Sequence, residues 1–106
     1  MNFPADVEAG DLLESLLASL LADFDHWFTR GPALLEQCPV SVLNPEERRE
    51  LAERLVGGKR SIAATRSLLQ ASSQPMAVSM GAMSPWHELV TEVWGLAAKL
   101  AVNRRN

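Results

Sequence analysis

The feature that most constrains the fold is a spacing of three and four residues between apolar side chains, which recurs in three separate segments. This is the period with which one face of an α-helix returns. The first segment covers residues 11–37 and contains Gly31-Pro32, where the missing backbone N–H predicts a kink or a short break. Its apolar positions are Leu13, Leu17, Leu20, Phe24, Trp27 and Leu34.

The second segment has clear start signals. Asn44 suits the N-cap, Pro45 suits the first helical position, and the two glutamates that follow favour the positive end of a helix dipole. Gly57 and Gly58 fall in mid-helix, where each costs about 1 kcal/mol relative to alanine. We expect another helix to approach closely there, with a local hinge as the alternative. The apolar stripe consists of Leu51, Leu55, Gly58, Ile62, Thr65 and Leu69.

The third segment opens with Ser84 as N-cap and Pro85 at the first helical position, and it ends in the basic run of residues 103–106. No segment alternates as a strand does, and the length suits one domain. We therefore expect an all-α fold, an antiparallel three-helix bundle. A flexible N-terminal arm at residues 1–10 would precede a single helical domain at residues 11–104. The apolar positions are Trp86, Leu89, Val90, Val93, Trp94, Ala97 and Leu100.

A Met-rich loop, "SSQPMAVSMGAMS" at residues 72–84, joins the second and third helices. It is too apolar for a solvated linker, so we expect it to cap the bundle core. The alternative is a deformable binding surface, because flexible thioether side chains adapt to several shapes. We expect Met83 to be buried, and Met76 and Met80 to be more exposed and used for binding.

The charge pattern bears on the class of partner. A net charge of −3 argues against a general nucleic-acid binder, so we expect no nucleic acid. Residues 1–38 carry seven acidic side chains against Arg30 alone, and residues 44–74 carry six Lys or Arg against four Glu. Acidic and basic helices facing each other within one fold would explain this, and a charged partner is the alternative.

The compartment follows from three observations. Cys38 is the single cysteine, which rules out an internal disulfide and favours a reducing environment. The start of the chain lacks the basic residues of a signal peptide, and charges interrupt the apolar run of residues 12–28, so we expect no membrane span. A cytoplasmic protein is the expectation.

Catalytic and metal chemistry find little support. Asp23 and His26 form one carboxylate-x-x-His pair, whereas di-iron bundles need two such pairs and two further glutamates. Neither histidine shares a catalytic signature with Cys38, and Glu88 and Glu92 one turn apart are typical of a solvated face. We expect no catalytic residue, no metal ligand, no cofactor and no enzyme activity.

Two histidine–tryptophan pairs, His26-Trp27 and Trp86-His87, are the most unusual local feature. The structural interpretation is that the indoles fill the core and the imidazoles lie at its boundary. The alternative is a partner or ligand pocket built on the rings. Trp86 and Trp94 are eight residues apart, close to two helical turns, so we expect both in the core.

Three stretches, "LLESLLASLLADFDHWFTRGPALLE", "LNPEERRELAERL" and "MSPWHELVTEVWGLA", resemble a small domain family of unknown function from cyanobacteria. The similarity covers residues 11–101, and "PWHELVTEVW" is its most specific part. It implies a cyanobacterial cytoplasm and a housekeeping role in a photosynthetic cell. The family offers no activity, cofactor or catalytic residue to carry over.

Two functional hypotheses follow. The first is a non-enzymatic interaction module, an adaptor or assembly factor, with a protein partner. The second is a bundle that binds a small apolar ligand or pigment between Trp27, Trp86 and Trp94. A homo-oligomer is a further open alternative. The candidate partner or ligand surface consists of His26, Trp27, Met76, Met80, Trp86 and His87.

Overall fold

Three helices make up the computed structural model, which describes the backbone of residues 3–71 and 80–105 and the side chains of residues 12–71 and 81–104. They are α1 (Phe3–Glu36), α2 (Pro45–Ala71) and α3 (Met80–Arg105). The molecule is elongated, 62 × 25 × 20 Å. The expected all-α three-helix bundle is confirmed, and α1 also includes residues 3–10, for which the sequence predicts an arm.

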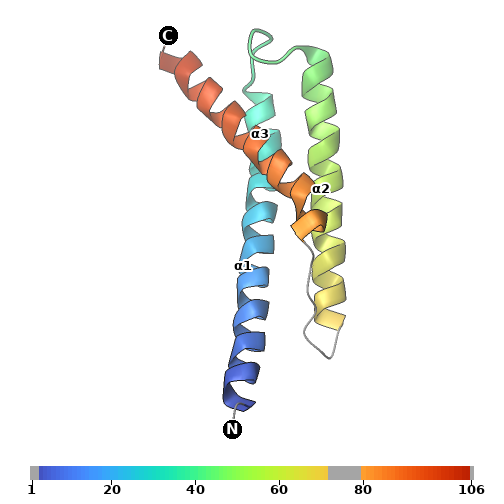
Figure 1. Cartoon of the computed structure of the whole chain (residues 1–106). Helices are drawn as coiled ribbons and strands as arrows, with labels where there is room; N and C mark the ends of the chain where they lie inside the picture. The colour runs from blue at the N-terminus through green and yellow to red at the C-terminus, as the bar shows by residue number, and fades with distance from the viewer. Residues whose placement is uncertain (1–2, 72–79, 106) are drawn as a thin grey trace.

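α1 and α2 form an antiparallel hairpin (Figure 1). Lys59 Nζ donates a hydrogen bond to Thr29 Oγ1 at 2.6 Å and lies 3.9 Å from an Asp25 carboxylate oxygen, which joins the basic helix to the acidic one. Nearer the connection between the helices, Gly31 packs against the side chain of Leu55. As residue numbers rise along α1, those of the contacting residues on α2 fall, so the two helices are antiparallel.

α3 lies across this hairpin and contacts both helices (Figure 1). Its ring contact between Trp86 and Phe24 has centroids 5.7 Å apart, and near its far end Arg104 donates a hydrogen bond to Gln37 at 3.2 Å. Between these two contacts the residue numbers of α1 and α3 rise together, so α3 runs in the direction of α1 and opposite to α2. The topology is up-down-up.

The core lies where the three helices meet. Val93, Phe28, Ile62 and Leu21 are fully enclosed, so all three helices supply its centre. Among the described side chains, no polar or charged one is buried. The buried apolar residues are Leu17, Leu21, Phe24, Phe28, Leu34, Leu35, Cys38, Leu51, Leu55, Ile62, Met83, Trp86, Leu89, Val90, Val93, Leu96 and Leu100.

α1 continues through Gly31-Pro32, so of the expected kink or short break, the break is absent. A proline within a helix costs about 3 kcal/mol. Leu34 and Leu35, which follow it, are both buried, and each contributes about 1.5–3 kcal/mol. Burial on the far side of the proline therefore offsets the lost hydrogen bond.

The close approach expected at the glycine pair is confirmed at Gly58. A Cβ there would lie 2.9 Å from Phe28 Cε2 and 3.0 Å from Leu89 Cδ2, so α1 and α3 both press on α2 at this point. A Cβ at Gly57 would meet nothing within 4 Å. Only one of the two glycines is required by packing.

The start of α2 follows the sequence expectation. The Glu47 backbone N–H donates to Asn44 Oδ1 at 2.8 Å, and the Asn44 N–H donates to Glu47 Oε1 at 3.0 Å. This reciprocal capping box satisfies two donors that the helix itself leaves free.

The start of α3 differs from the prediction. The helix begins at Met80, so Ser84 is not its N-cap and Pro85 lies inside it. Burial of Met83, which was expected, holds the extra turn against the core. Pro85 is the sixth residue of the helix, so it removes one hydrogen bond that the helix backbone would otherwise make. Part of the Met-rich stretch is therefore helical, and residues 72–79 lie outside the described part.

Candidate functional site

His26 and Trp27 lie on the part of α1 that faces α3. Their rings meet edge to face with centroids 5.2 Å apart, and Trp27 makes a second such contact with Trp94 of α3 at 5.9 Å. His26 is exposed and Trp27 is half-buried. These three side chains, His26, Trp27 and Trp94, form what we call the aromatic cluster.

Trp94 was expected in the core, and that prediction is wrong because 50% of the residue is exposed. Eight residues at 100° per residue leave a rotation of about 80° beyond two turns. That rotation carries Trp94 away from the side of Trp86, and Val93 occupies the core instead, fully buried. Trp94 consequently meets Trp27 edge to face and is half exposed to solvent.

The second histidine–tryptophan pair has different surroundings. Trp86 is only 8% exposed and packs edge to face on Phe24, so its expected place in the core is confirmed. His87 is exposed, and its ring contacts the same Phe24 with centroids 5.0 Å apart. The expectation of an indole inside and an imidazole at the boundary holds for this pair alone.

The two remaining candidate residues came from the Met-rich loop. Met76 lies outside the described residues. Met80 begins α3, and its side chain is outside the described set as well. The structure therefore brings together His26 and Trp27 and adds Trp94 to them, whereas Trp86 lies in the core against Phe24.

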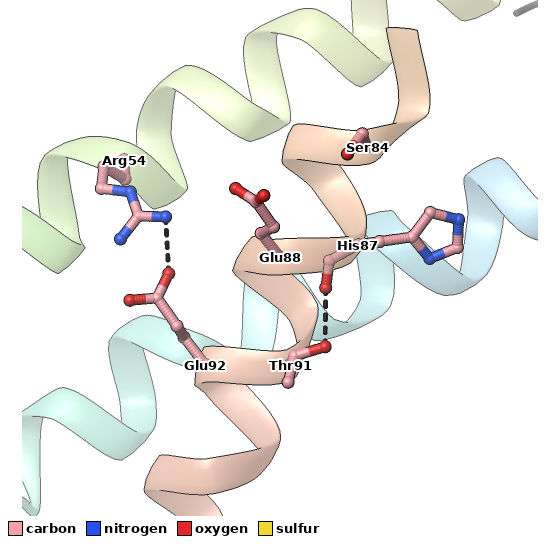
Figure 2. A pocket seen from close by; sticks show the side chains of 6 residues that line it. All are labelled: Arg54, Ser84, His87, Glu88, Thr91 and Glu92. Carbon is pink, nitrogen blue, oxygen red and sulfur yellow. Dashed lines mark hydrogen bonds and ion pairs between the residues drawn. The ribbon is translucent and has the colours of Figure 1, made fainter. Parts of the chain in front are cut away.

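A solvent-open hollow of about 500 Å³ lies between α2 and α3 and is shown in Figure 2. The Arg54 guanidinium donates a hydrogen bond to Glu92 at 2.5 Å, and this bond raises the pKa of Arg54 above its usual value. Both side chains are well exposed, so the pair adds at most about 1 kcal/mol to stability. The lining residues are Arg54, Ser84, His87, Glu88, Thr91 and Glu92.

This hollow offers little for catalysis. The His87 ring points away from the Arg54–Glu92 pair in Figure 2, and the Thr91 hydroxyl donates to the His87 carbonyl at 2.8 Å. Arg54 neutralises one of the two carboxylates at its rim. Such a site can hold water or a weakly bound ion, and it contains no paired nucleophile and base.

The other sequence candidates for chemistry lie apart from one another. Cys38 is buried, and its thiol lies 3.6 Å from the Pro39 carbonyl oxygen.

Among the described residues, no group of three or more His, Cys, Asp and Glu side chains could hold a metal ion. Within the same part of the chain, no helix has the length and hydropathy needed to span a membrane.

The fold and the aromatic cluster define a small all-α domain, a three-helix bundle that exposes an indole pair at the contact between its first and third helices. The chain belongs to the family described as protein of unknown function (DUF2605), which matches residues 7–102. No curated protein and no solved structure matches it significantly.

Proposed function

We propose that this protein is a non-enzymatic interaction module, an adaptor or assembly factor, that binds a protein partner through the aromatic cluster. The exposed indole of Trp94 beside Trp27 carries the proposal. Tryptophan is enriched among the few residues that dominate binding energy in protein interfaces. A ring that is held by a neighbouring ring loses little conformational freedom when a partner docks on it.

The surroundings of the cluster support a protein surface rather than an enclosed ligand site. The hollow between α2 and α3 is lined by other residues, and the rings of Trp27 and Trp94 contact each other directly. Trp86 packs edge to face against Phe24 and is buried in the core. A pigment or other small apolar ligand is therefore the second candidate, and it would need these rings to separate.

The cellular setting of the proposal rests on the sequence. The resemblance of the three quoted stretches to a cyanobacterial family supports a setting in the cytoplasm of a cyanobacterial cell. The single cysteine and the small net charge agree with a reducing compartment and with a partner other than nucleic acid.

The test uses the full chain with an affinity tag in its native host, in wild-type, Trp94→Ala and Val102→Ala forms. Val102 is also exposed on α3 and serves as the matched control. We expect Trp94→Ala to lose a partner that the wild type and Val102→Ala both retain. Once purified, this partner should bind the wild type and Val102→Ala directly and should not bind Trp94→Ala. Circular dichroism should show all three forms folded.

Two outcomes would contradict the proposal. If Trp94→Ala retains every partner of the wild type at equal affinity, the cluster is not the binding surface. If instead the purified wild type carries a visible absorption band that Trp94→Ala lacks, the ligand hypothesis replaces the partner hypothesis.

A further inference from the structure

The side of the α1–α2 hairpin that α3 covers continues beyond α3. On α1, Leu13, Leu20 and Trp27 repeat every seven residues, so they lie close to one line along the helix. Trp27 contacts Trp94 of α3 at the end of this line nearest the connection to α2. Leu13, two repeats earlier, is 50% exposed, and Leu16 between them is 58% exposed.

A matching line runs along α2. Arg54, Ser61 and Leu68 also repeat every seven residues, and Arg54 pairs with Glu92 of α3. Leu68, at the other end of this line, is 60% exposed. Each helix of the hairpin therefore meets α3 at one end of its line and is bare at the other.

Figure 1 shows why. α3 begins beside the middle of the hairpin and runs toward the connection between α1 and α2, so it leaves the other half as a layer of two helices. A helix hairpin alone buries too little apolar surface to be stable. We call the exposed apolar residues on this half, Leu13, Leu16 and Leu68, the uncovered face.

We propose that a second copy of this chain covers the uncovered face, so that the two hairpins pack face to face as four helices about a two-fold axis. The charges of the two helices favour this occupant. Residues 1–29 contain six acidic side chains and no Lys or Arg, whereas residues 54–71 contain four Lys or Arg and no acidic side chain. The same hairpin thus carries both halves of a complementary pair.

The charges also select the arrangement of the two copies. Placing α1 of one copy against α2 of the other brings unlike charges together on both sides of the two-fold axis. Placing α1 against α1 would bring like charges together. Arg60 and Arg66 form no ion pair with another described side chain, so they can meet acidic groups of a second copy.

The first test is the mass of the full-length protein in solution by light scattering and sedimentation across a range of concentrations. We expect the wild type to dimerise. Leu16→Glu should raise the dimer dissociation constant at least about 100-fold, because a two-fold interface loses the contact twice. Val40→Glu is the matched control, since Val40 is 67% exposed in the connection between α1 and α2 and should leave the dimer intact.

A wild type that stays monomeric at all concentrations would overturn the proposal, whether the face is covered by residues 72–79 or by another protein. Equal weakening by Leu16→Glu and Val40→Glu, with both variants folded, would overturn it too. The proposal does not rest on the aromatic cluster, and Trp94→Ala should still dimerise. The proposed function and the dimer can therefore fail separately.

A second test addresses the arrangement. Leu13→Cys in one preparation and Leu68→Cys in a second, tagged preparation are mixed and mildly oxidised, with the native Cys38 left in place because it is buried. We expect a disulfide between residue 13 of one copy and residue 68 of the other. A strong disulfide between two copies of residue 13 would refute the placement of α1 against α2.

Discussion

The neighbouring glycines of α2 allow a sharp test of how closely the helices pack. A Cβ at Gly58 would lie 2.9 Å from Phe28 Cε2 and 3.0 Å from Leu89 Cδ2, which is closer than van der Waals contact allows. Phe28 is fully buried and Leu89 nearly so, so neither side chain has free space to enter. A Cβ at Gly57 meets nothing within 4 Å.

The expected magnitudes follow from two opposing effects. Replacing either glycine with alanine gains about 1 kcal/mol of helix propensity. At Gly57 that gain stands alone, so Gly57→Ala should stabilise the protein by about 1 kcal/mol. At Gly58 overpacking costs about 1–3 kcal/mol, so the net effect runs from neutral to a loss of about 2 kcal/mol. The difference between the variants isolates the steric cost.

Urea denaturation followed by far-UV circular dichroism, with the same slope for all three proteins, measures this difference. Gly57→Ala controls for helix propensity in the same turn of the same helix. If Gly58→Ala stabilises the protein as much as Gly57→Ala does, α1 and α3 do not press on α2 at this point, and our account of the packing is wrong.

Four further predictions concern other parts of the bundle. Trp86→Ala should cost about 3–5 kcal/mol because its ring fills the core, whereas Trp94→Ala should cost about 0.5–1.5 kcal/mol, the worth of one aromatic pair; denaturation of both variants measures the gap. Asn44→Ala should cost about 0.5–2 kcal/mol because it removes the side-chain acceptor of the capping box, and an unchanged unfolding midpoint would contradict this. Met83→Ser should lower the melting temperature sharply, since the side chain is buried, and a thermal melt followed by circular dichroism measures the shift. A chelator should not shift the melting temperature, and elemental analysis of natively purified protein should find no stoichiometric iron, zinc or manganese.

Periodicity was sufficient to predict the three helices, and capping residues predicted the start of α2. The stripe from Leu51 through Gly58 to Leu69 predicted a close neighbour at Gly58, with a hinge as the alternative; the neighbour is present and α2 is continuous. Asn44 predicted the start of α2 because its side chain acts within one turn. Signals of this kind depend on residues only three or four positions apart, so they can be interpreted without knowing the tertiary structure.

The failures involve contacts distant in sequence. The break expected at Pro32 is absent because Leu34 and Leu35 beyond it are buried. That burial depends on how the helices pack against one another. Pro85 was taken as the start of α3, but Met83 adds a turn because it reaches the core. The aromatic cluster was predicted in part: His26 and Trp27 belong to the candidate surface, and Trp94 is expected in the core, although the ligand hypothesis sets it beside Trp27. The contact between Trp94 and Trp27 joins residues 67 positions apart, so helical periodicity does not indicate it. The rotation between Trp86 and Trp94 on α3 could have indicated that Trp94 lies outside the core.

α1 is packed among three helices around Phe28 and is half exposed around Leu13, so its backbone amides should open to solvent in two different ways. Around Phe28 the amides of α1 lie among three helices, so their hydrogen exchange requires the whole bundle to unfold. Around Leu13 the side chains are half exposed, and the same helix can fray there turn by turn at much lower free energy. Protection against exchange should therefore fall steadily from Phe28 toward the N-terminus, with no break in the helix to mark the boundary. How many turns of α1 persist in solution is then decided by what packs against them.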